Sequence, residues 1–297
     1  MNIAEKLAQT DNESRQRVNA VGHISAKCSK RTPGYDQNNS TPNSSLSQLY
    51  QQGSARIRIP NTESAALHAV LLNTAGGLTG NDHIHWKADA EKLSHLCVST
   101  AACEKIYRTH GPAAIQQNTL HVAHQARLEW LPQESILFNG SHLSRCMDVH
   151  LAEQAEALIV ESLVLGRQAM NEQVDSICVR DRWRIYRDKH LLHAEDFHLD
   201  MRSNKLAQTQ CMMHQYGAIT TLVLVTNQSD DWFDAQLSRV RALLPSNSLD
   251  IRMGASVLPS RLVVRALAQD SFQLRKFLIP CIELLNDGRP VPTVWNV

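Results

Sequence analysis

A succession of short apolar and alternating segments constrains the fold of this chain most. From Ala55 onward these segments are four to about ten residues long, and turn residues separate many of them. They include ARIRI, ALHAVLL, HIHWKA, HLCVST, RLEWL, ALIVESLVL, ICVRDRWRIY and ITTLVLVT. Alternation with period two is typical of half-buried strands, and closely spaced strands favour a mostly-β fold over strands that alternate with helices. The length of 297 residues allows one large all-β domain or two smaller domains.

Two helices are expected toward the C-terminal end. One begins near Asp231, where an acidic cap precedes apolar residues at helical intervals, and it stops before Pro245. The other spans roughly Ser271 to Leu285, and Pro280 is expected to kink or divide it. The chain has no exact internal repeat, so the sequence by itself does not demonstrate a regular solenoid.

Residues 1–45 are polar and contain the turn-rich run TPGYDQNNSTPNSS, which can bury little apolar area. We therefore expect a mobile leader at 1–45 and a single β-rich domain at 46–297. The N-terminus lacks a charged segment followed by an apolar core, and about eighteen apolar residues never run together. These features predict a cytoplasmic protein.

Charge and cysteine content narrow the function classes. Lys and Arg number 30 against 29 Asp and Glu, for a net charge of +1, so no global field attracts nucleic acid or an anionic membrane. Neither is expected as a partner. The seven cysteines are an odd number without a CxxC pair, which argues against a disulfide framework or a structural zinc site.

The segment LLNTAGGLTGND, which ends at Asp82, carries a glycine-rich turn. Gly76, Gly77 and Gly80 allow a tight loop and a close approach of the backbone to another group. A P-loop would need a Lys followed by Ser or Thr, and a dinucleotide fingerprint would need GxGxxG, and neither is present. Because the alternating run HIHWKADA follows, the sequence predicts a strand–turn–strand hairpin, and an anion cradle stays open as the alternative.

Two histidines of that run are candidate metal ligands. Residues i and i+2 of a strand point to one face, so His83 and His85 could offer two imidazoles to one ion. The spacing identifies no third ligand, and histidines on a wet strand face are the alternative. HExxH and GxSxG motifs are absent, so the commonest hydrolase signatures are missing.

Acidic residues inside apolar runs are the stronger signal. An ionised carboxylate is costly to bury unless it is paired, coordinated or near water. The pattern predicts either a salt-bridge network or a polar interior that suits a weakly bound divalent cation. The acids are Glu129, Glu134, Glu161, Glu195 and Asp196, and Arg108, Arg167, Arg182 and Arg184 could pair with them.

Seven blocks in order give the chain a specific resemblance. They are YQQGSARIRIP, LLNTAGGLTGND, STAACEKIYRTHGPAA, LEWLPQESILFNG, VESLVLGRQAMNE, DRWRIYRD and LLHAEDFHLD. From roughly Leu46 to its C-terminus, the chain resembles the urease accessory protein D family, UreD, called UreH in some bacteria. The resemblance implies stacked mixed β-sheets in a β-helix-like body, with a few helices toward the C-terminus.

The resemblance also implies a non-enzymatic chaperone or scaffold for nickel insertion. Its partners would be apo-urease, a helical UreF-like adaptor and a UreG-like GTPase. It implies no tightly bound cofactor, but transient Ni²⁺ that passes through a water-filled tunnel. The rival classes are a stand-alone metal-dependent hydrolase, for which the sequence offers no ligand cluster, and an interaction module that binds no metal.

Site residues follow by position in the matching blocks. Asp82, Glu134 and Glu161 are expected to line or gate the nickel path, and their alternative role is to hold loops by charge-assisted hydrogen bonds. The three glycines are expected to shape their loop. In the C-terminal segment RPVPTVWNV, Trp295 would either dock on a partner or pack on its own domain.

Departures from the family pattern are few. Asn81 stands where a glycine is usual, and its side chain tolerates a left-handed backbone. Asn139 stands where an Asp is common, which makes this position a poor candidate ligand.

Overall fold

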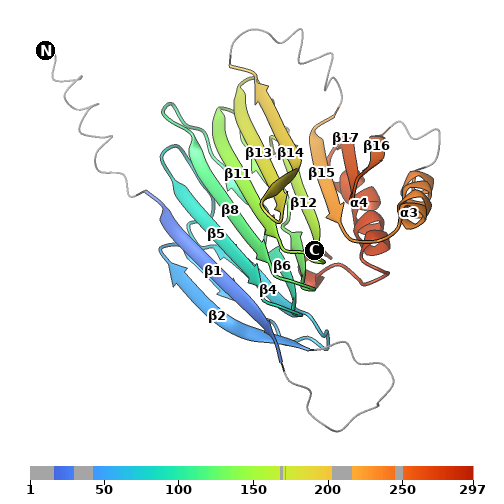
Figure 1. The fold of residues 1–297 in the computed structure, drawn as a ribbon. Coiled ribbons are helices and arrows are strands. Elements are labelled where there is room, and N and C mark those ends of the chain that lie inside the picture. The colour runs from blue at the N-terminus through green and yellow to red at the C-terminus, as the bar shows by residue number, and fades with distance from the viewer. Residues whose placement is uncertain are drawn as a thin grey trace, which may run out of the picture.

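Two β-sheets face each other, and two helices cover part of the second sheet (Figure 1). The computed structural model describes residues 17–29, 43–167, 170, 172–202, 216–244 and 250–296. Strands account for 54% and helices for 13% of the structure. The expected mostly-β fold of stacked sheets is therefore confirmed.

The first sheet has seven strands. In spatial order they are β14 (His190–Asp200), β13 (Ile177–Arg187), β11 (Ser141–Leu151), β8 (Ala114–Val122), β5 (His83–Ala90), β1 (Asn19–Cys28) and β2 (Ser44–Gln52).

The second sheet has ten strands. Its main path runs β16 (Ile251–Leu258), β17 (Arg261–Ala268), β15 (Ala218–Val225), β12 (Glu156–Leu165), β9 (Arg127–Leu131), β6 (His95–Thr100), β4 (Leu67–Asn73) and β3 (Ala55–Arg58). The short strand β10 (Ser135–Leu137) pairs with β12 and with β7 (Glu104–Ile106).

The chain winds as a β-solenoid of about 4 turns. It passes from β4 in the second sheet to β5 in the first, and then alternates between the sheets through β6, β8, β9, β11, β12 and β13. Neighbouring strands from successive turns are parallel, so Lys87, Thr119, Asp148 and Arg184 form one row across the first sheet. Antiparallel strands β2, β14, β15, β16 and β17 lie outside this coil.

The main core lies between the sheets, and period-two alternation builds it. On β5, Ile84, Trp86 and Ala88 are buried, whereas the residues between them are partly exposed. A second core joins the second sheet to α3 (Asp230–Ala242) and α4 (Ser271–Leu285), and it includes Phe233 and Phe277. The two helices therefore add a third layer.

Both expected helices are confirmed. The cap of α3 is Ser229 and not the expected acidic residue, since its side chain accepts a hydrogen bond from the backbone N–H of Trp232; the Asp270 side chain caps α4 by accepting from the backbone N–H of Gln273. Pro280 lies inside α4 but does not divide it, because the helix continues to Leu285. No helix within the described ranges has the length and apolar character needed to cross a membrane.

Two expectations from the sequence are wrong. Part of the expected leader is strand β1, which pairs in parallel with β5 and buries Ala20, Ile24 and Ala26, so the domain begins before residue 45. The rest of that leader, residues 1–16 and 30–42, lies outside the described residues. The glycine segment is not a hairpin, because β4 and β5 belong to different sheets and the loop carries the chain from one sheet to the other.

Candidate functional site

A charged cluster lies between the two sheets, with Arg145 at its centre. Arg145 is an inward-facing residue of β11 and is only 1% exposed. Its Nε and Nη2 donate to the two carboxylate oxygens of Asp181 at 3.0 and 2.6 Å, and its Nη1 donates to Glu161 Oε2 at 2.5 Å. The Arg145 guanidinium therefore forms ion pairs with two buried carboxylates.

Glu161, the acid inside ALIVESLVL, is fully engaged by this cluster. Its Oε1 accepts hydrogen bonds from Trp130 Nε1 at 2.9 Å and from Asn118 Nδ2 at 3.2 Å. Burial and the neighbouring Asp181 raise the pKa of Glu161, and the attraction of Arg145 only partly offsets them. Glu161 therefore gains a proton more readily than an exposed glutamate.

A cavity of about 210 Å³ adjoins Glu161. It has room for several water molecules at about 30 Å³ each. The Oε1 atom of Gln116 is buried without a hydrogen-bond partner, and Gln116 is one of the residues that line the cavity. Burial raises the pKa of Glu104 to about 7. The polar residues of the lining are Asn73, Thr100, Cys103, Glu104, Lys105, Gln116, Gln133, Ser135 and Glu161.

Glu134 does not line this cavity. It is completely buried, and Arg275 of α4 donates from Nε to Oε1 and from Nη2 to Oε2, each at 2.7 Å. The Cys103 thiol lies 3.3 Å from Oε2. Burial would raise the pKa of Glu134, but the hydrogen bonds and charge of Arg275 outweigh burial and lower it. These contacts fit the loop-holding role.

Asp82 also lies apart from the cavity lining and closes the glycine loop. One carboxylate oxygen accepts the backbone N–H of Val18 at 2.9 Å, and the other accepts that of Thr79 at 2.8 Å. Asn81 has a φ of 65°, the left-handed conformation that the sequence allowed for. The carboxylate therefore fixes a turn and ties it to the residue before β1.

The loop glycines meet close neighbours. A Cβ at Gly77, where φ is +151°, would collide with the Tyr107 ring and lie 2.6 Å from the Lys105 carbonyl oxygen. A Cβ at Gly80 would collide with the Thr109 hydroxyl. Gly76 has a φ of +78° and open space around it. The loop needs glycine for close packing at two positions and for backbone conformation at the third.

His83 and His85 share the outer face of the first sheet, so they point away from the cavity. The imidazole Nε2 of His85 lies 2.9 Å from the Thr119 hydroxyl. Asn139 is likewise engaged, since its Oδ1 accepts the backbone N–H groups of Asp175 and Ser176. The predicted histidines therefore do not point into the cavity beside Glu161.

Trp295 is buried, at 1% exposure, which favours the alternative in which the C-terminal segment packs on its own domain. Its Nε1 donates to the Leu131 carbonyl at 3.0 Å, and the Arg275 guanidinium lies 5.5 Å from the ring centroid. The tail packs on its own domain because the large ring fills the core beneath α4 and its N–H group finds a backbone acceptor.

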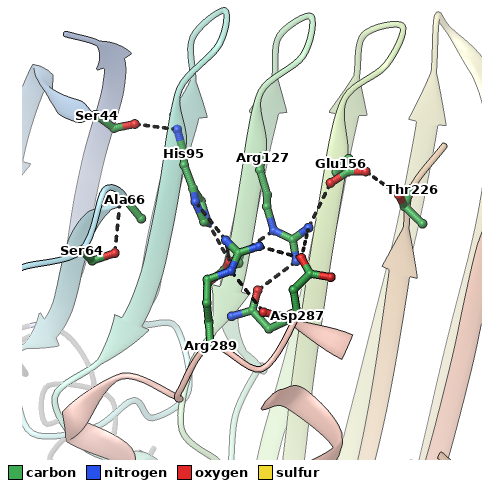
Figure 2. Close-up of polar contacts among 11 residues, drawn as sticks. Ser44, Ser64, Ala66, His95, Arg127, Glu156, Thr226, Asp287 and Arg289 are labelled. Carbon is green, nitrogen blue, oxygen red and sulfur yellow. Dashed lines mark hydrogen bonds and ion pairs between the residues drawn. The ribbon is translucent and has the colours of Figure 1, made fainter. Parts of the chain in front are cut away.

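A second ionic network ties the C-terminal segment to the second sheet (Figure 2). Arg127 donates to Glu156 at 2.9 Å and to the Asn286 side chain at 2.9 Å. Glu129 accepts from His95 at 2.6 Å and lies 3.6 Å from Arg289. Burial opposes ionisation of Glu129, but the hydrogen bond with His95 and the charges of Arg127 and Arg289 lower its pKa to about 2.

The fold and the cluster around Arg145 define a β-solenoid protein with a carboxylate-lined cavity that reaches from exposed loop residues to Glu161. A family model described as "UreD urease accessory protein" matches residues 32–296. The chain belongs to the UreD urease accessory protein family, as the seven sequence blocks indicated.

Two relatives illustrate the similarity. "Urease accessory protein UreD" of Rhizobium leguminosarum bv. viciae is 42% identical over 282 residues, which cover 95% of this chain and 96% of the relative. "Urease accessory protein UreD 1" of Brucella abortus biovar 1 (strain 9-941) is 38% identical over 287 residues, covering 96% of each chain.

Proposed function

We propose that this chain is a non-enzymatic scaffold of urease maturation. In this proposal it binds apo-urease, acts with a UreF-like adaptor and a UreG-like GTPase in the cytoplasm, and conducts Ni²⁺ toward the urease active site. Family membership and the names of the relatives support the role in maturation. The proposed partners and the nickel path come from the family resemblance.

The cavity beside Glu161 is the observation that favours a nickel path. Glu161, Glu104 and Gln116 line it, the Gln116 Oε1 atom is buried without a hydrogen-bond partner, and oxygen ligands of this kind can accept a hydrated divalent ion. Arg145 and the raised pKa values of the two glutamates oppose tight binding, because a cation must compete with a guanidinium and with protons. Weak binding suits an ion in transit.

Asp82 and Glu134 are weaker candidates for the path. Unlike Glu161, neither acid lines the cavity, and their carboxylate oxygens accept backbone N–H groups or the Arg275 guanidinium. These contacts favour the alternative in which both acids hold loops. A gating role for either acid would require the existing hydrogen bonds to be exchanged for contacts with nickel.

The test is urease activation in a urease-positive host that lacks its own UreD. Activity is measured at equal urease abundance, with limiting and with excess nickel. The wild-type chain should restore activity, and Glu104→Gln and Glu161→Gln should activate poorly at limiting nickel and recover in excess. Glu134→Gln and the exposed control Glu153→Gln should follow the wild type once their fold and assembly are verified.

Two results would contradict the proposal. If the wild-type chain is soluble and bound to its adaptor but restores no activity, the role in maturation is wrong. If both cavity variants assemble and match the wild type at limiting nickel, the cavity does not carry the ion, and the chain is an interaction module without a metal path.

A further inference from the structure

A mixed set of side chains that can bind metal lies on the outer face of the first sheet. None of its residues is among the site residues predicted from the sequence. Cys178, His198 and Asp200 place one thiol sulfur, one imidazole nitrogen and one carboxylate oxygen within 4.8 Å of one another. Among the described residues, this group alone brings three such side chains to that proximity.

Strand register creates the group. Cys178 on β13 is the cross-strand partner of Asp200 on β14, and His198 precedes Asp200 by two positions on the same strand. Cross-strand partners share a face, and so do residues i and i+2, so all three side chains project from one side of the sheet.

The same rule explains why His83 and His85 do not form such a site. Their neighbours in register are Asn19 and Val21 on β1. On β8 the neighbours are Ile115 and Gln117. None of these directly paired side chains is a thiol, an imidazole or a carboxylate, so register places no third ligand directly beside His83 or His85.

We propose that Cys178, His198 and Asp200 form a binding site for a late first-row divalent cation such as Ni²⁺, Co²⁺ or Zn²⁺. One sulfur, one nitrogen and one oxygen are a ligand set that these borderline ions accept. When the ion binds, the Cys178 thiol releases its proton to solvent and water fills the remaining coordination positions. The site lies outside the cavity beside Glu161, and its existence does not depend on the proposed role in maturation.

Neighbouring arginines set the expected strength of binding. Arg202 donates from Nε and Nη2 to the two oxygens of Asp200, at 2.9 and 2.6 Å. Oδ1 also accepts the backbone N–H of Arg202 at 3.0 Å, so the lone pair that remains for an ion is on Oδ2. Arg180, the cross-strand neighbour of His198, donates to Asp196 at 3.3 Å and does not occupy the imidazole. The nearby positive charge weakens affinity, so the site holds its ion reversibly.

Access differs among the three ligands. The Cys178 residue is 4% exposed, whereas His198 is exposed and Asp200 is half-buried. An ion can therefore reach the imidazole and carboxylate from solvent and then contact the sulfur at the base of the site. A partly exposed site with a buried thiol differs from a closed structural metal site.

Cobalt absorption tests the site on the purified full-length chain. A Co²⁺–thiolate bond gives a charge-transfer band in the near ultraviolet, and Ni²⁺ affinity is measured separately by calorimetry. Cys178→Ser should abolish the band, and Cys178→Ser and His198→Asn should each weaken Ni²⁺ binding at least about tenfold. Cys146→Ser and His190→Asn are matched controls on the same sheet and should behave as the wild type.

Arg202→Ala adds a test of opposite sign. It frees Asp200 from its guanidinium partner, so it should tighten Ni²⁺ binding several-fold, a gain that a merely structural cluster would not show. The proposal is overturned if the wild type gives no thiolate band, if Cys178→Ser keeps it, or if folded His198→Asn binds Ni²⁺ as the wild type does. Urease activation is not a readout here, so this result is separate from the test of the maturation role.

Discussion

The guanidinium of Arg275 holds both carboxylate oxygens of Glu134, each at a distance of 2.7 Å. Arg275 belongs to α4, and Glu134 directly precedes β10 of the second sheet. The pair therefore ties the helical layer to the solenoid next to Gln133 and Ser135, which line the cavity. Because Glu134 is completely buried, the pair is sensitive to the loss of either partner.

Arg275→Met should destabilise the protein by about 3 to 5 kcal/mol, since it leaves a buried carboxylate without its cation. Urea unfolding measures the loss. The double variant Glu134→Leu with Arg275→Met should recover part of it, because no unpaired charge stays buried. If the double variant loses as much stability as the two single variants together, the residues do not act as a pair. Arg180→Ala, at an exposed ion pair, should unfold as the wild type does.

Glu129 should make the fold acid-sensitive. Its pKa is about 2 in the folded protein against an ordinary value of 4.5. A lowered folded pKa means that the stabilisation is fully present above about pH 4.5 and is lost as the pH falls toward 2. The contribution is about 3 kcal/mol. Urea unfolding from pH 2 to 7 should show this loss in the wild type, and Glu129→Gln should show a flatter profile. Equal slopes would exclude Glu129 as the source.

Glu104 should have the opposite effect on the pH dependence of stability. Its folded pKa of about 7 lies above the ordinary value of 4.5, so the folded state holds the proton more tightly. Stability is therefore greatest below about pH 4.5 and falls as the pH rises through 7. Glu104→Gln keeps an acceptor for Asn73 and removes the charge. At pH 8 it should be more stable than the wild type by roughly 1 to 3 kcal/mol, and at pH 4 the two should be equal. A variant less stable than the wild type at pH 8 would contradict this prediction.

Local pattern predicted the elements of this fold but not their assembly. The helix at Ser271–Leu285 and most strands follow from periodicity and caps that lie within a few residues. Solenoid register joins positions about one coil apart, such as His83 with Ile115, and no turn motif between them specifies that pairing. Strand β1 escaped prediction because small residues alternate on its inner face, where a Cβ at Gly22 would collide with the ring of Trp86.

The residues of the candidate site could likewise be predicted only in part. Burial cost correctly marked Glu134 and Glu161 as acids that need partners, but the partners Arg275 and Arg145 were not among the expected arginines. Arg145 was detectable, because it shares the inward face of β11 with Leu143, Met147 and Val149 and must therefore be paired with buried acids. The group at Cys178 was not detectable, because its ligands meet only through the register of β13 and β14.

Trp295 should contribute to stability and not to partner binding. Trp295→Ala removes a buried ring from the core beneath α4 and should cost about 3 to 5 kcal/mol. Trp295→Phe keeps most of the packing but loses the hydrogen bond to the Leu131 carbonyl, which should cost about 1 kcal/mol. Phe272→Ala, at an exposed position of α4, should leave the melting temperature nearly unchanged. Thermal unfolding and adaptor capture are measured on the same preparations. Unchanged melting with lost capture in Trp295→Ala would restore the docking role that burial of the ring argues against.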